Sequence, residues 1–116
     1  MSGHPRVAYK VLTASQRSEL EGGSFAGAPV DLADGYIHLS GADTLTGTVD
    51  KHFAGQSDLH VAAVDLTRFG DALRWEVSRG DMLFPHLYAP LPLAAVIAMA
   101  PLSRTADGTV ALPDAD

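Results

Sequence analysis

Cysteine is absent from this sequence, and its absence excludes several kinds of site. A chain without thiols forms no disulfide scaffold, offers no thiolate nucleophile and holds neither a thiolate zinc site nor an iron–sulfur cluster. Disulfides belong to oxidising compartments, so a chain without them fits a reducing one. We therefore expect a cytoplasmic protein.

Long apolar runs are missing as well. No run approaches the roughly 18 apolar residues that a membrane span requires, and the first residues lack the apolar core of a signal peptide. The most apolar stretch, residues 90–102, is interrupted by Pro92 and Pro101. That stretch is typical of a buried strand, and the sequence predicts no membrane partner.

Positive charge is scarce. Lysine and arginine number 8 against 14 aspartate and glutamate residues, which gives a formal net charge of −6. Arg68, Arg74 and Arg79 are scattered along the chain, whereas binding to long nucleic acid requires several phosphates to be neutralised together. Long nucleic acid is therefore not an expected partner.

The length of 116 residues is enough for one domain with a hydrophobic core. We expect this single domain to span residues 1–116, with its core between about residues 6 and 102. Residues 103–116 are polar and form a tail. Within it, Asp107 and Gly108 are either the tip of a hairpin or part of a loose segment.

The first third of the chain predicts a strand, a helix and a loop. Residues 6–12 alternate between the two faces of a half-buried strand. Thr13 and Gln16 have the spacing of a capping box, which predicts a short helix directly after that strand. Residues 24–33 are rich in glycine and proline and are expected to form a loop, with Phe25 as its one buried side chain.

Strands dominate the rest of the chain. Ser40 and Asp43 can cap a second helix over about residues 42–53. Residues 59–66 are almost continuously apolar, which is typical of a central strand. The alternation of side chains and the flanking turn residues predict further strands at residues 36–39, 73–77, 82–88 and 94–102.

This order of elements predicts the fold class. A strand and a helix, then a strand and a helix, then a run of strands is typical of an α+β fold with compact, split antiparallel sheets and two short helices. No glycine-rich loop follows a predicted strand, and Gly22-Gly23 lacks the spacing of a dinucleotide fingerprint. Rossmann and P-loop nucleotide sites are therefore excluded.

The most informative segment runs from Asp34 to Ser40 (DGYIHLS). Because strand side chains alternate with period two, Tyr36 and His38 share one face. An imidazole within an apolar strand costs desolvation unless its nitrogens are satisfied. This pair is therefore a candidate site for a ribose or a flat heterocycle. The alternative is a core histidine bonded to a backbone carbonyl, and Asp34 is explained by its turn.

A second segment of the same kind covers residues 84–88 (FPHLY). His86 and Tyr88 repeat the imidazole and phenol pair on another strand. Pro85 removes a backbone donor, so this strand is expected at the edge of a sheet or with a bulge. The alternative is a structural aromatic cluster beneath a loop.

Glu76 is the carboxylate that we single out. Residues 73–77 alternate strictly, which predicts that Trp75 and Val77 face the core and that Glu76 faces the opposite way. A carboxylate on a sheet face beside a histidine can activate a nucleophile or bind a ribose hydroxyl. The alternative is a solvent-facing residue paired with a basic one such as Arg74.

Two other kinds of site receive less support. His38, His60 and His86 lie on separate predicted strands and could converge on zinc, but their spacing resembles no ligand pair on one element. Ser24 and Ser40 lack the context of a nucleophile elbow, which disfavours a serine hydrolase.

Several motifs together resemble those of a known family. They are Tyr9-Lys10, residues 34–40, Thr48, Phe53, Trp75-Glu76 and residues 84–88. Over about residues 7–98 the chain resembles the bacterial family called domain of unknown function 952, which has no established activity. The fold of that family resembles the ADP-ribosyltransferase superfamily, whose active members hold NAD in a cleft and cleave its nicotinamide–ribose bond.

The resemblance implies that the ligand is NAD or a nucleotide-like small molecule, bound without a metal. It implies that His38 binds a ribose or a phosphate, that His86 polarises the ligand and that Glu76 supports an oxocarbenium-like transition state. The other binding positions that it implies are Tyr9, Lys10, Tyr36, Ser40 and Tyr88, with Trp75 shaping the pocket.

Two functions of different classes follow, and the further alternative is a plain structural domain whose histidines are core residues. The first is ADP-ribosyl or glycosidic transfer in a cleft lined by His38 and His86. The second is a non-catalytic module that binds a metabolite or a protein and whose histidines are structural. The catalytic hypothesis requires two imidazole-bearing strands that face each other across one water-accessible hollow.

Overall fold

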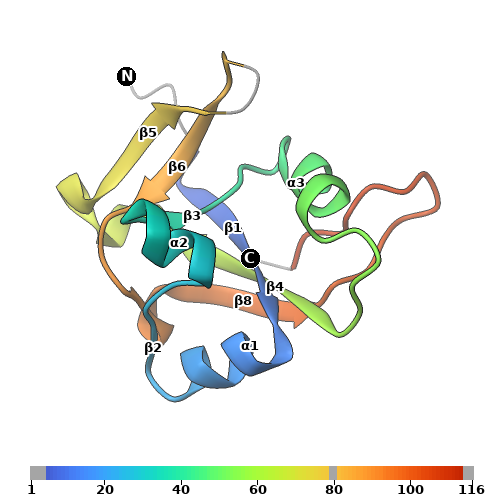
Figure 1. Cartoon of the computed structure of the whole chain (residues 1–116), viewed down its shortest axis with the longest axis horizontal. Helices are drawn as coiled ribbons and strands as arrows, with labels where there is room; N and C mark the ends of the chain where they lie inside the picture. The colour runs from blue at the N-terminus through green and yellow to red at the C-terminus, as the bar shows by residue number, and fades with distance from the viewer. Residues whose placement is uncertain (1–4, 79–80, 114–116) are drawn as a thin grey trace.

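The computed structural model describes residues 5–78 and 81–113, and within them the strands form three antiparallel sheets (Figure 1). The first sheet has the order β1-β4-β8, from β1 (Val7–Thr13), β4 (Leu59–Asp65) and β8 (Val96–Pro101). The second pairs β2 (Ser24–Phe25) with β7 (Leu91–Pro92). The third has the order β3-β6-β5, from β3 (Ile37–His38), β6 (Leu83–Leu87) and β5 (Leu73–Val77).

Three short α-helices accompany the sheets in this part of the chain: α1 (Ala14–Glu21), α2 (Pro29–Asp34) and α3 (Leu45–His52). Short 3-10 turns occur at Leu66–Arg68, Gly70–Ala72 and Leu93–Ala95. None of the helices among the described residues combines the length and the apolar character needed to cross a membrane. The α+β composition and the antiparallel sheets confirm the predicted fold class at this level.

The first sheet is buried on both faces. Alternate side chains of β1 and β4 enter two different core clusters, because side chains on a strand point alternately to the two faces. Ala8 and Leu12 belong to the first cluster, whereas Tyr9 and Val11 belong to the second. This arrangement explains why residues 59–66 are almost continuously apolar. Strand β4 lies at the centre of its sheet, as predicted.

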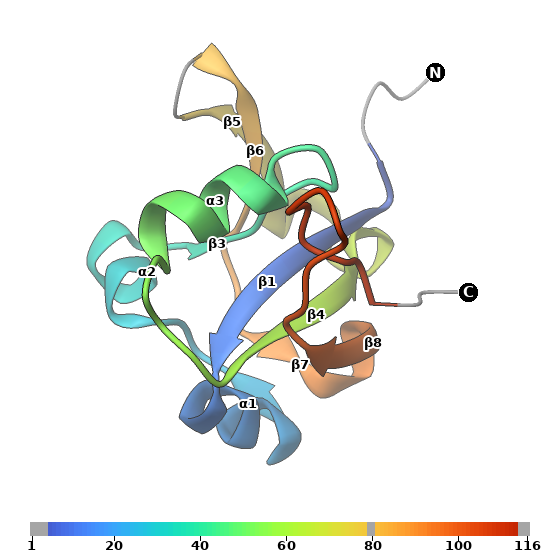
Figure 2. The ribbon, with the colours of Figure 1, turned by 90° about the vertical axis from the view of Figure 1, so that its right-hand side faces the viewer.

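The first and third sheets meet at one backbone bridge. The amide of Tyr9 donates to the carbonyl of Ser40 at 2.7 Å, and the amide of Ser40 donates to the carbonyl of Tyr9 at 2.8 Å. The bridge brings the end of the β3 segment against β1. From this junction the β5–β6 hairpin projects away from the body of the molecule (Figures 1 and 2).

The predicted capping box is confirmed. The amide of Gln16 donates to Oγ1 of Thr13 at 3.2 Å, and the amide of Thr13 donates to Oε1 of Gln16 at 3.0 Å. Two orphan amides at the start of α1 are therefore satisfied reciprocally. The next prediction, a loop over residues 24–33, is wrong, because this segment contains β2 and most of α2.

Helix α2 arises from signals that the loop interpretation overlooked. Pro29 stands at the first helical position, where its missing N–H costs nothing. Gly35 ends the helix with a φ of 88°, a left-handed conformation that suits glycine. The second helix was also misplaced: α3 begins at Leu45, three residues later than predicted, and Ser40 does not cap it. The last strand begins at Val96.

Pro85 does not mark an edge strand, since β6 is the middle strand of its sheet. The amide of Ser78 donates to the carbonyl of Met82, and the amide of Tyr88 donates to that of Ala72. Hydrogen-bonded and non-hydrogen-bonded pairs alternate along an antiparallel ladder, so the pair of Pro85 with Trp75 exchanges no hydrogen bonds. Its missing N–H therefore points toward β3, where the strand is ending. A proline is tolerated there without an edge or a bulge.

Strand β5 confirms part of its predicted pattern. Trp75 is half-buried and packs against the first core cluster. Val77 is 63% exposed, so its predicted place in the core is wrong. The reason is tertiary: Val77 is the last residue of β5, and the β5–β6 hairpin projects from the body of the molecule (Figure 1). Arg79 and Gly80, between the predicted strands at residues 73–77 and 82–88, lie outside the described residues.

The tail is structured over its described part, residues 103–113. Asp107 and Gly108 form a hairpin tip closed by the bridge between Arg104 and Val110. Val110 is 2% exposed and belongs to the second core cluster, and its amide donates to Oγ1 of Thr46 at 2.9 Å. The tail therefore packs beside α3 (Figure 2).

We predict that Val110→Ala lowers the free energy of unfolding by about 1–2 kcal/mol, because two buried methyl groups are lost and a small cavity remains. Leu112 is 44% exposed, so Leu112→Ala is the matched control and changes stability by less than about 0.5 kcal/mol. Urea unfolding of both variants is the measurement. Equal effects of the two substitutions would contradict a packed tail.

Candidate functional site

The third sheet presents one polar and aromatic face. His38 pairs with His86 across β3 and β6, and His86 pairs with Arg74 across β6 and β5. Residues two apart share that face, so Tyr36 and Glu76 lie on it as well. The opposite face carries Ile37 and Leu87, which are buried in the first core cluster. The two histidine motifs are therefore neighbours on one surface.

Four rings on this face are in mutual contact. The ring centroid of Tyr36 lies 4.1 Å from that of His86, with planes at 25°, and 4.6 Å from that of His38. The centroids of Tyr36 and Tyr88 are 5.2 Å apart, and those of the two imidazoles are 5.6 Å apart in an edge contact. Tyr36 thus covers His86, which is only 3% exposed.

Glu76 fixes one end of this cluster. The phenol of Tyr88 donates to Oε1 of Glu76 at 2.7 Å, and Nδ1 of His86 lies 2.8 Å from the same oxygen. The hydrogen bond from Tyr88, followed by that from His86, lowers the pKa of Glu76, and the same bond raises the pKa of Tyr88. Glu76 is therefore an ionised acceptor beside a histidine, as its strand position predicted.

Asp31 forms hydrogen bonds at the other end of this cluster, beside His38. Its carboxylate, with a side chain 1% exposed, accepts from Nζ of Lys10 at 3.0 Å and from the amide of Ala28 at 2.8 Å. It also accepts from the amide of His38 at 3.1 Å and lies 2.6 Å from Nδ1 of that residue. Nζ of Lys10 donates further to the carbonyl of His38 at 3.0 Å. We call Lys10, Asp31 and His38 the buried triad because its carboxylate and ammonium are buried, although the side chain of His38 is 31% exposed.

Ionised Asp31 decides the proton position on His38. Burial alone raises the pKa of this carboxyl, but the hydrogen bond from His38, the charge of Lys10 and two backbone amides outweigh burial and lower it to about 2. Burial lowers the pKa of Lys10, and the carboxylate of Asp31 opposes that effect. An ionised carboxylate only accepts hydrogen bonds, so Nδ1 of His38 is the donor.

The second ring nitrogen of His38, Nε2, is not bound by Asp31. Nε2 lies 3.0 Å from Oδ2 of Asp34, whose side chain is 47% exposed and able to turn toward solvent. A histidine oriented through Nδ1 by a buried carboxylate can accept or donate a proton, or bind a ligand oxygen, through Nε2. Asp34, explained from the sequence by its turn alone, is therefore in direct contact with the imidazole.

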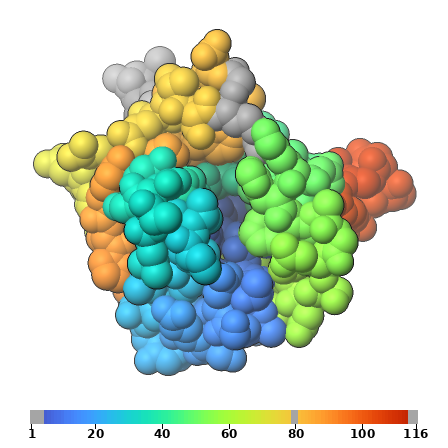
Figure 3. Space-filling view, viewed as in Figure 1, coloured from blue at the N-terminus to red at the C-terminus, as the bar shows by residue number. Residues whose placement is uncertain are grey.

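His38 and Asp34 both line a cavity of about 490 Å³. Figure 3 shows the hollow between α2 and α3, with β1 visible at its floor. Fourteen residues line it: Tyr9, Lys10, Val11, Val30, Asp34, His38, Leu39, Ser40, Thr48, Lys51, His52, Phe53, Ser78 and Phe84. We call it the larger cavity. Its volume lies within the range of about 300–1,000 Å³ that is usual for small-molecule sites.

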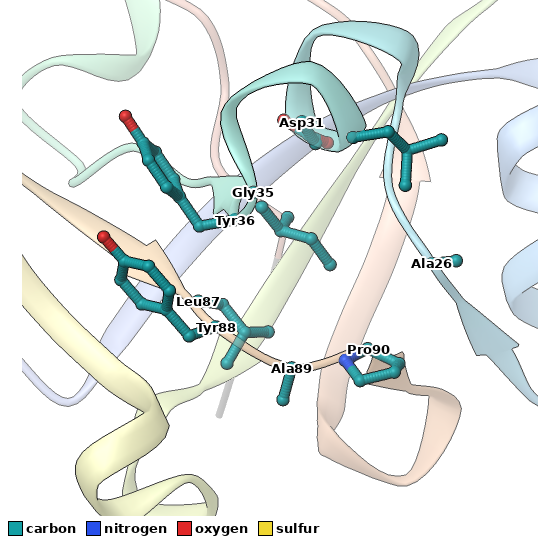
Figure 4. Close-up of a pocket in the computed structure, with 10 residues that line it drawn as sticks. Ala26, Asp31, Gly35, Tyr36, Leu87, Tyr88, Ala89 and Pro90 are labelled. Atoms are coloured by element: carbon teal, nitrogen blue, oxygen red, sulfur yellow. The ribbon is translucent and has the colours of Figure 1, made fainter.

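The predicted site residues divide between two places. Tyr9, Lys10, His38 and Ser40 line the larger cavity. Tyr36 and Tyr88 line a smaller cavity of about 260 Å³, where their rings stand side by side (Figure 4). We call it the smaller cavity, and Asp31 lies on its wall as well.

His86 and Glu76 line neither of these two cavities. The predicted arrangement of two strands that face each other across a hollow is wrong, and neither of these two cavities is lined by both His38 and His86. Strands β3 and β6 are hydrogen-bonded neighbours, so their imidazoles stand side by side on one face instead of opposite each other. Tyr36 then closes the access to His86.

The three histidines weighed for a zinc site are not neighbours in one sheet. His60 lies on β4 in a different sheet, where Nδ1 contacts Nη1 of Arg17 at 2.9 Å. Among residues 5–78 and 81–113, no group of three histidine, aspartate or glutamate side chains is placed to hold a metal ion.

Sequence reasoning missed Asp31 and the contact of Asp34 with His38. A signal was present: aspartates at the third and last positions of a helix that starts at Pro29 lie on neighbouring turns. Reading residues 24–33 as a loop removed that spacing from view. Thr48, whose Oγ1 is 3.0 Å from Oγ of Ser40, entered only through the family resemblance.

Comparisons with known proteins give a family and a solved relative. Residues 11–99 match the model of the family described as protein of unknown function (DUF952). The crystal structure of protein CC0527 from Caulobacter crescentus is similar at 42% identity, covers 90% of this chain and 93% of that one, and has a TM-score of 0.82. Its solution NMR structure gives 42% identity, 91% of each chain and a TM-score of 0.77. No curated protein matches this chain.

Proposed function

This chain belongs to the DUF952 family, whose function is unknown, and we propose that it binds NAD or a nucleotide-like small molecule in the larger cavity. The observation that carries the proposal is the position of His38: Nδ1 is held by buried Asp31 at 2.6 Å while the side chain lines the cavity. Such an imidazole has a fixed orientation, and a ligand could take the place of Asp34, which now lies 3.0 Å from Nε2.

The lining of the larger cavity supports this class of ligand. Tyr9, Phe53 and Phe84 provide aromatic surface for a flat ring, and Ser40 and Lys10 provide polar groups at the floor. A cavity with mostly apolar walls and a few convergent polar groups is typical of small-molecule sites. The smaller cavity, with Tyr36 and Tyr88, offers a second aromatic surface nearby.

The reaction that we propose is ADP-ribosyl or glycosidic transfer on an ADP-ribosyltransferase-like fold in a bacterial, cytoplasmic protein. Cleavage of the nicotinamide–ribose bond releases nicotinamide with the bonding electron pair and leaves positive charge on the ribose, which water or an acceptor hydroxyl then quenches. A carboxylate near the ribose stabilises that charge. Asp34 is the carboxylate that lines the larger cavity, with His38 as the ribose-binding group.

One observation favours the second candidate, a binding module without catalysis. Glu76, to which the family resemblance gives the transition-state role, is outside both cavities and is held by His86 and Tyr88. A structural role for Glu76 leaves Asp34 as the single carboxylate lining the larger cavity among the described residues. Measuring binding and turnover separately distinguishes the two candidates.

We predict that His38→Asn weakens NAD binding about tenfold, the effect of losing one good hydrogen bond. The asparagine amide keeps a donor near the position of Nδ1, so the contact with Asp31 is retained while Nε2 is lost. His60→Ala, on β4, is the control and leaves the affinity unchanged. Calorimetric titration with NAD, ADP-ribose and nicotinamide is the measurement.

Release of free nicotinamide from NAD then separates enzyme from binder. Turnover that His38→Asn abolishes supports transfer, and binding without turnover supports the module. If none of the three ligands binds to the wild-type chain, the proposed function is wrong.

A further inference from the structure

The charges around the larger cavity largely compensate one another. Lys10 is paired with Asp31 at 3.0 Å, and both side chains are buried. Asp34 faces Nε2 of His38. Lys51 lies exposed on α3 and also lines the cavity. Among the lining residues that the structure describes, it is the one fully charged group without an ion-pair partner. Lys51 is therefore the one lining cation that remains available to an anion, at an exposed position of the cavity.

Two common groups for binding phosphate are absent from the described lining. Phosphate is typically held by arginine forks, by the N-termini of helices or by lysines, and of these only lysines are present here. No arginine is among the described residues that line the larger cavity. Helix α3 contributes Thr48 from its middle and Lys51 and His52 from its last turn, and its N-terminal residues are not among the lining residues. The C-terminal end of a helix carries partial negative charge and disfavours an anion.

The cavity does carry side chains that can bind the hydroxyl groups of a ligand. Oγ of Ser40 and Oγ1 of Thr48 are 3.0 Å apart at the cavity wall, and each both donates and accepts. The ammonium of Lys10 has three protons, of which two go to Asp31 and the carbonyl of His38. Asp34 adds an acceptor. Alternating donors and acceptors of this kind suit a ligand with several hydroxyl groups.

Apolar walls complete the arrangement. Val11, Leu39, Phe53 and Phe84 line the same cavity as the hydroxyl pair. A ligand with a polyhydroxylated part and a flat apolar part satisfies both surfaces, because each surface is desolvated by a chemically matching group. A sugar joined to a heterocycle has this composition.

We infer that the larger cavity recognises the nucleoside portion of its ligand, the sugar and the base, and leaves any phosphate groups outside in solvent. The inference rests on the proposed function, since it names which part of a nucleotide-like ligand the site binds. It goes beyond that function because NAD and nucleotides carry phosphates that this site does not require.

Calorimetric titration of the wild-type chain with adenosine, adenosine 5′-monophosphate, inorganic phosphate and NAD tests the inference. We expect the dissociation constants of the nucleoside and its monophosphate to agree within about threefold, a difference below roughly 0.7 kcal/mol. We also expect little change in affinity between about 50 and 500 mM salt, and no binding of inorganic phosphate.

Two variants locate the binding. Ser40→Ala is expected to weaken nucleoside and monophosphate binding equally, by about three- to tenfold, because the hydroxyl pair with Thr48 is lost. Ser18→Ala, at an exposed position of α1, is the matched control and leaves both unchanged. Unchanged binding by Ser40→Ala would overturn the role of the hydroxyl pair.

The possible failures are distinguishable. If NAD binds but adenosine is more than about tenfold weaker than its monophosphate, the nucleoside inference is wrong and the proposed function stands. If neither NAD nor the nucleoside binds, both are wrong.

Discussion

Replacing Asp31 with leucine is expected to lower the free energy of unfolding by roughly 3–5 kcal/mol, the cost of leaving a buried charge without its partner. Nζ of Lys10 has Asp31 as its charged partner at 3.0 Å, and the two side chains are 8% and 1% exposed. The substitution also leaves the amides of Ala28 and His38 without the acceptor that they have now. Urea unfolding measures the loss.

Two controls distinguish the buried charge from a general effect of substitution. In Lys10→Met with Asp31→Leu the stranded charge is gone, and we expect much of the lost stability to return, since apolar replacements of buried ion pairs are often well tolerated. Glu21→Gln removes an exposed ion pair with Arg17 and changes stability by less than about 0.5 kcal/mol. An Asp31→Leu chain as stable as Glu21→Gln would contradict the buried triad.

Acid is expected to remove the contribution of Asp31 selectively. The pKa of this carboxyl falls from its ordinary 3.8 to about 2 in the folded chain, so its stabilisation is complete above pH 4 and is lost as the pH falls toward 2. Each pH unit between the two values is worth about 1.4 kcal/mol. The stability difference between the wild-type chain and Asp31→Asn therefore shrinks by about 2 kcal/mol between pH 5 and pH 2.

The comparison with Asp31→Asn is necessary because a second carboxyl titrates in the same range. The pKa of Asp107 is also lowered to about 2, by hydrogen bonds from Thr105 and Thr109. That group is present in both chains, so its effect cancels in the difference. A difference that stays constant from pH 5 to pH 2 would show that Asp31 does not gain its stabilisation as an anion.

Patterns of neighbouring residues predicted several features of the fold correctly. The capping box at Thr13, the central position of residues 59–66 and the shared face of Tyr36 and His38 each follow from a spacing of a few residues. The structure confirms each of these predictions.

Two predictions that depended on pairing between distant strands were wrong. Nothing in residues 84–88 reveals that β6 has neighbours on both sides, so Pro85 suggested an edge. For the same reason, His38 and His86 were predicted to face each other across a hollow, although they are paired residues in one sheet. Partner choice among strands is set by the packing of the whole chain, which a short pattern does not contain.

Asp31 shows why the candidate site could not be predicted in full from the sequence. Its role depends on Lys10, 21 residues earlier, and on His38, seven residues later. Only the closure of β1, α2 and β3 around one buried point turns an ordinary helix aspartate into the partner of both. The catalytic hypothesis had Glu76 as its carboxylate, because a strand face beside a histidine was visible in the sequence and a buried triad was not.

The central claim is that the oriented imidazole of His38 contacts a ligand bound in the larger cavity. Two-dimensional NMR of the histidine rings during a titration with NAD tests it most directly. The account predicts a saturable shift of the Nε2 and Cε1–H signals of His38, with Nδ1 still protonated, while the signals of His60 do not move. A His38 ring that stays unperturbed at saturating NAD, or that loses the proton on Nδ1 in the free chain, would contradict it.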